Sequence, residues 1–145
     1  MNFIKISLLL VSVFIVSLSF AQDLSKHQWE NRLILLITDD ESNSTFQSQL
    51  AELRKDLTGL NERKLILYQV MPEAYRTGLD DGDIKESAHL YQGYKKTDSR
   101  FEVVLVGLDG GIKLRKNEIL LLEELYAIID AMPMRLREME RKKQR

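Results

Sequence analysis

The chain has 145 residues with no cysteine, and its 21 lysines and arginines against 22 aspartates and glutamates leave a formal net charge of −1. The absence of cysteine excludes disulfides, thiol nucleophiles, CxxC redox pairs and cysteine-ligated metal centres. A net charge this close to zero provides no general attraction to nucleic acid, so nucleic acid is not an expected partner. A content of 44% hydrophobic and 30% charged residues is typical of one globular domain with its own core.

The first 21 residues have the pattern of a secretory signal peptide. Lys5 is their only charged side chain, residues 6–20 are apolar apart from serines, and Ser19 and Ala21 are small residues at positions −3 and −1 of a cleavage site. The alternative is an uncleaved signal anchor, although the apolar run is shorter than the ~20 residues that span a bilayer. We therefore expect an extracytoplasmic protein, periplasmic or secreted, that is cleaved near Ala21 and keeps no transmembrane segment. Without cysteine, a lipid anchor is excluded.

The next part of the chain predicts a strand, a helix and a second strand. Arg32–Thr38 is a continuous apolar run that ends on acidic residues, as expected of a strand buried on both faces. Ser44 and Gln47 fit a capping box, and apolar side chains at spacings of three and four continue to residue 60, which predicts one amphipathic helix over residues 44–60. Residues 64–70 form the second apolar run. A strand–helix–strand unit of this length predicts a parallel crossover.

The middle of the chain is more polar. Residues 73–82 predict a loop. Asp83, with Glu86 three residues later, predicts the start of a short helix that ends near Tyr94.

The last part predicts a hairpin and a helix. Residues 101–108 form a third apolar strand, an Asp-Gly-Gly turn follows, and residues 112–116 alternate apolar and basic side chains like a strand with one wet face. Asn117 is a candidate cap for an amphipathic helix over residues 121–132, which Pro133 ends.

This order, β-α-β-α-β-β-α, predicts a single α/β domain with a four-stranded mixed sheet flanked by helices. We place the domain at residues 22–134 and a basic C-terminal tail at residues 135–145. The tail has six basic and two acidic residues, a local charge of +4. Such a tail is either a solvated chain end or a surface that attaches to anionic components of the cell envelope.

Four segments resemble domain of unknown function family 4174, a family of small secreted proteins with relatives among equarin and the sushi-repeat-containing proteins. They are residues 29–32 (WENR), 61–64 (NERK), 101–115 (FEVVLVGLDGGIKLR) and 129–135 (IDAMPMR). The resemblance covers about residues 29–134. It implies a thioredoxin-like fold and supplies no established activity.

The resemblance to thioredoxin-like proteins also implies what this chain lacks. Redox enzymes of that fold carry reactive cysteines where the first strand meets the first helix, and a cis-proline before the third strand. Residues 39–44 (DDESNS) and Arg100-Phe101 stand at those places here. Both hallmarks are missing, so thiol redox activity is excluded.

The remaining candidate binding residues are Asp39, Asp40 and Glu41 at the end of the first strand, together with Arg100 and Trp29. Open α/β sheets bind ligands at such strand ends, and three carboxylates suit a hard cation. The alternative is a solvated turn before a helix, where acidic residues are favourable in any case. The sequence leaves open whether the five side chains share one pocket.

No catalytic residue, metal site or cofactor is assigned, since no nucleotide-binding or hydrolase motif occurs and His27 and His89 lie far apart. We expect a non-catalytic binding or interaction module whose partner is a protein or an envelope component. The alternatives are an enzyme or metal-binding protein that uses Asp39, Asp40 and Glu41, and envelope attachment through the basic tail. The sequence does not determine the oligomeric state.

Overall fold

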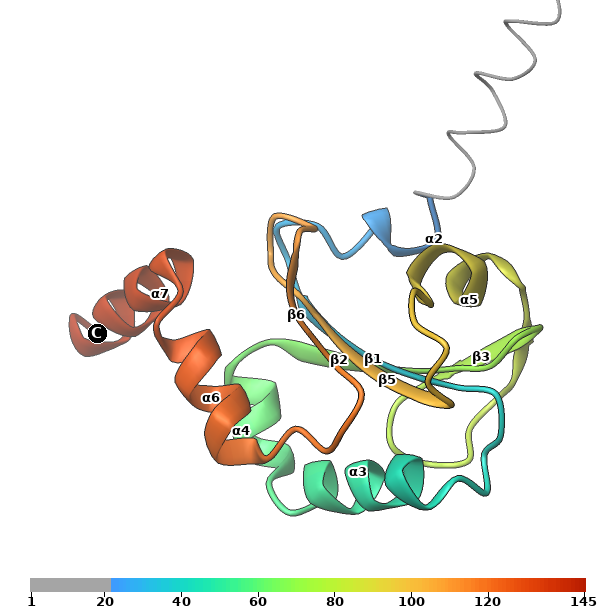
Figure 1. Ribbon diagram of the computed structural model, residues 1–145. Coiled ribbons are helices and arrows are strands. Elements are labelled where there is room, and N and C mark those ends of the chain that lie inside the picture. The colour runs from blue at the N-terminus through green and yellow to red at the C-terminus, as the bar shows by residue number, and fades with distance from the viewer. Residues whose placement is uncertain (1–21) are drawn as a thin grey trace, which may run out of the picture.

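The computed structural model describes residues 22–145, so the predicted signal peptide lies outside the described residues. The protein has a mixed α/β fold with one sheet between helices (Figure 1). Its strands are β1 (Arg32–Thr38), β2 (Leu65–Val70), β3 (Ala74–Thr77), β4 (Lys85–Glu86), β5 (Phe101–Val106) and β6 (Ile112–Lys116). Its helices are α2 (Gln22–Ser25), α3 (Ser44–Arg54), α4 (Leu57–Glu62), α5 (His89–Tyr94), α6 (Leu122–Asp130) and α7 (Pro133–Lys143). Within residues 22–145, none of the helices combines the length and the apolar character that crossing a membrane requires.

The sheet has six strands in the order β4-β3-β2-β1-β5-β6, so the prediction of four strands was wrong. The four predicted strands form its centre and one edge: β1 is parallel to β2 and antiparallel to β5, which pairs with β6. The two additional strands come from the stretch predicted as a loop and a helix start. Val70 pairs with Tyr75, and Ala74 pairs with Glu86. These short polar strands form because β2 offers an open edge, which no local apolar pattern signals.

Helices cover both faces of the sheet, and each face has its own apolar core. On one face, α3, α4 and α6 pack over Ile34 and Leu36. On the other face, α2 and α5 pack over Leu33, Leu35 and Ile37 (Figure 1). Successive side chains of a strand point to opposite faces, so a strand between two cores must be apolar throughout. The prediction that residues 32–38 are buried on both faces is confirmed, because every residue of β1 is buried.

The helix predicted over residues 44–60 is interrupted and forms α3 and α4. Asp56, between them, has a φ of −146°, which is not helical, and its carboxylate accepts a hydrogen bond of 2.8 Å from the backbone N–H of Gly59. An aspartate that caps a new helix in this way competes with continuation of the first one. The hydroxyl of Tyr126 in α6 donates to the same carboxylate at 3.0 Å. The residue that caps α4 is therefore also hydrogen-bonded to α6.

The caps of α3 also differ from the prediction. Asn43, not Ser44, is the N-cap, and its side-chain oxygen accepts from the backbone N–H of Phe46 at 3.0 Å. Gln47 donates to the carbonyl of Glu41 at 2.7 Å instead of returning to the cap. Adjacent Asn and Ser residues are both good caps, so the sequence alone does not distinguish them.

Two later helices begin further along the chain than predicted. α5 starts at His89 because the preceding residues join β4, and α6 starts at Leu122 rather than near Asn117. Before α6, the side chain of Gln49 in α3 binds both backbone groups of Leu120: it donates to the carbonyl at 2.9 Å and accepts from the N–H at 2.7 Å. Gln49 and Leu120 are both fully buried. This contact holds the chain extended up to the helix.

Replacing Gly59 with Ala is expected to destabilise the protein by about 1–3 kcal/mol, the usual cost of overpacking a tight contact. A Cβ at Gly59 would lie 2.1 Å from Oδ2 of Asp56 and 2.5 Å from the hydroxyl of Tyr126. Chemical denaturation measures the change. Gly93→Ala in α5 is the matched control, because a Cβ there meets no atom within 4 Å, and a helical glycine replaced by alanine gains stability. Equal effects of the two substitutions would contradict the role of Gly59.

Candidate functional site

The acidic turn follows the carboxyl end of β1 and faces the residue before β5. Because Thr38 pairs with Phe101 across the two strands, Arg100 lies beside the turn. Its Nε is 3.4 Å from Oδ1 of Asp39, and its Nη2 is 3.3 Å from Oδ2 of Asp40. The structure thus brings three of the five predicted residues together. All three side chains are exposed enough that such ion pairs contribute little to stability.

The backbone of this turn is held by buried Thr38. Its hydroxyl lies 2.8 Å from the carbonyl of Asp40 and 3.1 Å from the carbonyl of Arg100, so it links the two segments. Hydrogen bonds from the side chain and the backbone N–H of Ser42, together with Arg100, lower the pKa of Asp40. Asp40 is therefore a stable anion at neutral pH and is not suited to act as a general base.

Glu41 turns away from the other two acids. Its Oε1 is 2.7 Å from Nη2 of Arg76, a buried residue of β3 that also binds Asp81 at 2.9 Å. The three carboxylates therefore do not form one cluster. Across residues 22–145, no group of three or more histidine or acidic side chains is placed to hold a metal ion. The arginine that separates Glu41 from its neighbours comes from β3, which the sequence did not predict.

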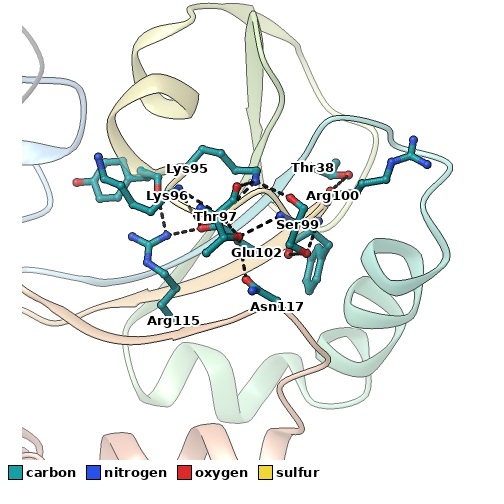
Figure 2. A network of polar contacts seen from close by, with 11 residues as sticks. Thr38, Lys95, Lys96, Thr97, Ser99, Arg100, Glu102, Arg115 and Asn117 are labelled. Carbon is teal, nitrogen blue, oxygen red and sulfur yellow. Dashed lines mark hydrogen bonds and ion pairs between the residues drawn. The ribbon is translucent and has the colours of Figure 1, made fainter.

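A buried glutamate positions the loop that carries Arg100 (Figure 2). The side chain of Glu102 in β5 is fully buried and forms ion pairs with Lys95, at 3.2 Å, and with Arg115. It also accepts hydrogen bonds from the hydroxyl and the N–H of Thr97, both at 2.6 Å, and from the N–H of Lys96 at 3.1 Å.

These bonds determine the ionisation of Glu102. Burial by itself raises the pKa of Glu102, but the hydrogen bonds from Thr97, Lys95 and Lys96 outweigh it and lower the pKa to about 2. The carboxylate is enclosed by its partners, so its role is to anchor the loop and not to contact a ligand.

Trp29 lies at the other end of β1 from the acidic turn. Its backbone N–H donates to the carbonyl of Leu108 at 2.6 Å, its φ is +69°, and the residue is 61% exposed. Between it and Asp39 lies β1, whose seven residues extend over about 23 Å. The five predicted residues therefore do not share a pocket. Trp29 instead lines a groove with Lys64 and with Arg137 and Arg141 of α7.

A group of charged residues beneath α7 was not predicted. Nη1 of Arg32, which is fully buried at the start of β1, donates to the carbonyl of Arg63 at 2.9 Å and lies 3.3 Å from Glu138 of α7. Arg135 of α7 is also buried and binds Asp130 at 3.1 Å and Glu138 at 3.2 Å. The predicted boundary between residues 134 and 135 thus falls inside α7, whose first turns are held to the sheet. The only signal in the sequence is an arginine that opens an apolar strand.

A cleft of about 480 Å³ opens beside Arg32. It lies between the junction of α6 and α7 and the turn between β5 and β6. Besides Arg32, its lining includes the apolar residues Leu108, Ile128, Met132 and Met134 and the cationic Lys113. Clefts of this size with an apolar lining and few polar groups are typical of ligand sites.

The comparison with protein families agrees with the resemblance found in the sequence. A family model described as "Domain of unknown function (DUF4174)" matches residues 23–138. The chain belongs to this family. The DUF4174 match extends past residue 134 and includes Arg135 and Glu138, so the residues that hold α7 against the sheet are part of the family domain. No curated protein matches the chain.

Proposed function

We propose that this DUF4174 protein is a non-catalytic extracytoplasmic binding module with a thioredoxin-like core. The strand arrangement supports the fold: a parallel unit of β1, α3, α4 and β2 shares one sheet with an antiparallel unit of β5 and β6, which α6 follows. The basic, apolar and small-residue pattern of residues 1–21 supports the secretory route.

The observation that carries the proposal is the ion-paired acidic turn. In a thioredoxin-like redox enzyme, the reactive thiol would stand between the first strand and the first helix. In this chain, Asp39 and Asp40 face Arg100 there, and Glu41 faces Arg76. An arginine beside each carboxylate offsets its charge and occupies its oxygens, which favours a structural role over nucleophilic or metal-assisted chemistry.

A binding role still needs a surface with room for a ligand, and the cleft at the opposite end of β1 from the acidic turn meets this need. It is lined mainly by apolar side chains and has the buried Arg32 in its wall. This combination supplies apolar contact area together with a cationic group that favours a negatively charged ligand. We therefore assign the binding function to this cleft and not to the acidic turn.

The proposal predicts that the purified protein turns over neither disulfides nor peroxide and retains a molecule from envelope extracts. Native mass spectrometry after incubation with such an extract measures the retained mass. The variant with Asp40→Ala and Glu41→Ala is expected to retain the same species, because both residues lie outside the cleft. Turnover of either substrate, or repeated failure to retain any species, would contradict the proposal. Loss of retention in the double variant would move the site to the acidic turn.

A further inference from the structure

We propose that the cleft binds a small organic carboxylate with an apolar body, and that Arg32 and the amino end of α7 hold its carboxylate. This inference rests on the proposed binding function and specifies its ligand. Three features of the cleft lead to it: unused hydrogen-bond donors on a buried arginine, an excess of positive charge around that arginine, and an uncapped helix start in the cleft wall.

The first feature is the guanidinium of Arg32. Nη1 is occupied by the carbonyl of Arg63 and by Glu138, but Nε and Nη2 are buried and have no hydrogen-bond partner. These two nitrogens form one edge of the planar group, directed away from Nη1. Nη1 faces the side of β2, to which Arg63 leads, whereas the cleft lies on the side of β5, at Gly107. The unused edge carries two parallel donors, which match the two oxygens of a carboxylate.

The second feature is the local charge. The ion-pair network beneath α7 joins four cationic side chains to only two carboxylates. The cations are Arg32, Arg63, Lys64 and Arg135, and the carboxylates are Asp130 and Glu138. Arg32 is fully buried, and it shares Glu138 with Arg135 and Lys64. It therefore has no carboxylate of its own, and a bound anion would add negative charge beside it.

The third feature is the start of α7. The N-cap residue, Met132, provides no side-chain hydrogen bond to the first turn, and Pro133 follows it. Both residues line the cleft, as does Met134. The first turn of an eleven-residue helix carries partial positive charge, and such helix starts bind anions. The helix start and the free edge of Arg32 therefore favour the same kind of ligand atom.

The lining and the size of the cleft indicate the rest of the ligand. Leu108, Ile128, Met132 and Met134 provide apolar contacts. The volume of about 480 Å³ corresponds to about 16 waters at ~30 Å³ each, which suits a ligand of about a dozen non-hydrogen atoms. The two free nitrogens are buried, so side chains of the lining have to shift to admit the carboxylate. Two of the lining residues are methionines, which adapt readily.

The one acid in the lining does not oppose an anion. Asp109 is 2.8 Å from the ammonium of Lys113 and accepts a hydrogen bond of 3.0 Å from the N–H of Gly111. Its charge is therefore already neutralised by protein groups.

Calorimetric titration with decanoate tests the inference, with 1-decanol and decyl phosphate as comparison ligands. We expect decanoate to bind at least tenfold more tightly than 1-decanol, and Arg32→Met to abolish this difference. Because Arg32 also has structural bonds, a second variant leaves it in place: Ala131→Trp, at the exposed rim of the cleft, should weaken decanoate binding at least tenfold. Ala127→Trp is the matched control, since Ala127 is exposed on α6 and does not line the cleft.

Equal binding of decanoate and 1-decanol would overturn the inference, and so would unchanged decanoate binding in Ala131→Trp. Tenfold preference for decyl phosphate would overturn the assignment of a carboxylate. Retention of an envelope molecule without decanoate binding would refute this inference alone. If the protein neither retains an envelope molecule nor binds decanoate, the proposed function is refuted as well.

Discussion

Replacing Glu102 with Gln is expected to destabilise the protein by about 3 kcal/mol at neutral pH, the usual order for removing one charge from a buried pair. The side chain of Glu102 is fully buried, and the substitution would leave Lys95 and Arg115 without their shared carboxylate. The glutamine oxygen can still accept from the Thr97 and Lys96 N–H groups, but its NH2 group would face the Arg115 guanidinium, donor against donor. Urea denaturation at pH 7 measures the change.

The pH dependence of the same variant tests the cause. The pKa of Glu102 is about 2 in the folded protein, against 4.5 for the ordinary group. A carboxyl whose pKa is lower in the folded state stabilises the fold above its unfolded pKa, and this contribution is lost as the pH falls through the folded value. The difference between wild type and Glu102→Gln should therefore be largest above pH 4.5 and decline towards pH 2.

Glu118→Gln is the matched control for both measurements, because Glu118 is exposed. It should leave the free energy of unfolding nearly unchanged at each pH. A constant difference between wild type and Glu102→Gln over the whole range would show that the loss comes from packing and not from the charge.

Gln49→Leu is expected to destabilise the protein by about 2–4 kcal/mol. Gln49 satisfies both backbone groups of Leu120 in a fully buried place. A leucine fills a similar volume but leaves a buried N–H and a buried carbonyl unpaired, at ~1–3 kcal/mol each. Thermal and urea denaturation measure the loss.

Gln92→Leu is the control, since it makes the same substitution at an exposed position of a helix, α5. Its effect should stay within about 0.5 kcal/mol. If Gln49→Leu were neutral as well, the chain before α6 would not depend on this side-chain clamp, and the observed start of α6 at Leu122 would need another cause.

The sequence predicted the elements whose apolar pattern is strong. β1 and β6 have the predicted bounds, and β2 and β5 differ from the predicted ranges only at their ends. The predicted secondary structure was wrong where a few polar residues adopt a structure that packing against another strand or helix imposes. β3 and β4 exist because β2 offers an edge, and the break at Asp56 depends on a contact with Tyr126 from α6.

The candidate site was likewise predicted only in part. Asp39, Asp40 and Arg100 come together because β1 and β5 are antiparallel neighbours, so that the end of β1 lies beside the start of β5. Glu41 and Trp29 do not join them: an arginine of β3 binds the first, and the length of β1 separates the second. The acidic run itself does not reveal this outcome, since Arg100 binds the first two acids and Arg76, from another strand, binds the third.

By itself, the sequence determined that this protein has no thiol chemistry, that it resembles the DUF4174 family, and that its central strands are buried on both faces. Composition is enough for the first statement and short-range periodicity for the third, while the second is a resemblance carried by four matching segments. Only the tertiary structure decided that Arg32 is buried, that Glu138, 106 residues away, binds one of its nitrogens, and that two others have no partner. The physical reason is that the cost of a buried charge depends on groups that folding gathers from distant parts of the chain. A net charge of −1 thus conceals a network beneath α7 in which four cationic side chains share two carboxylates.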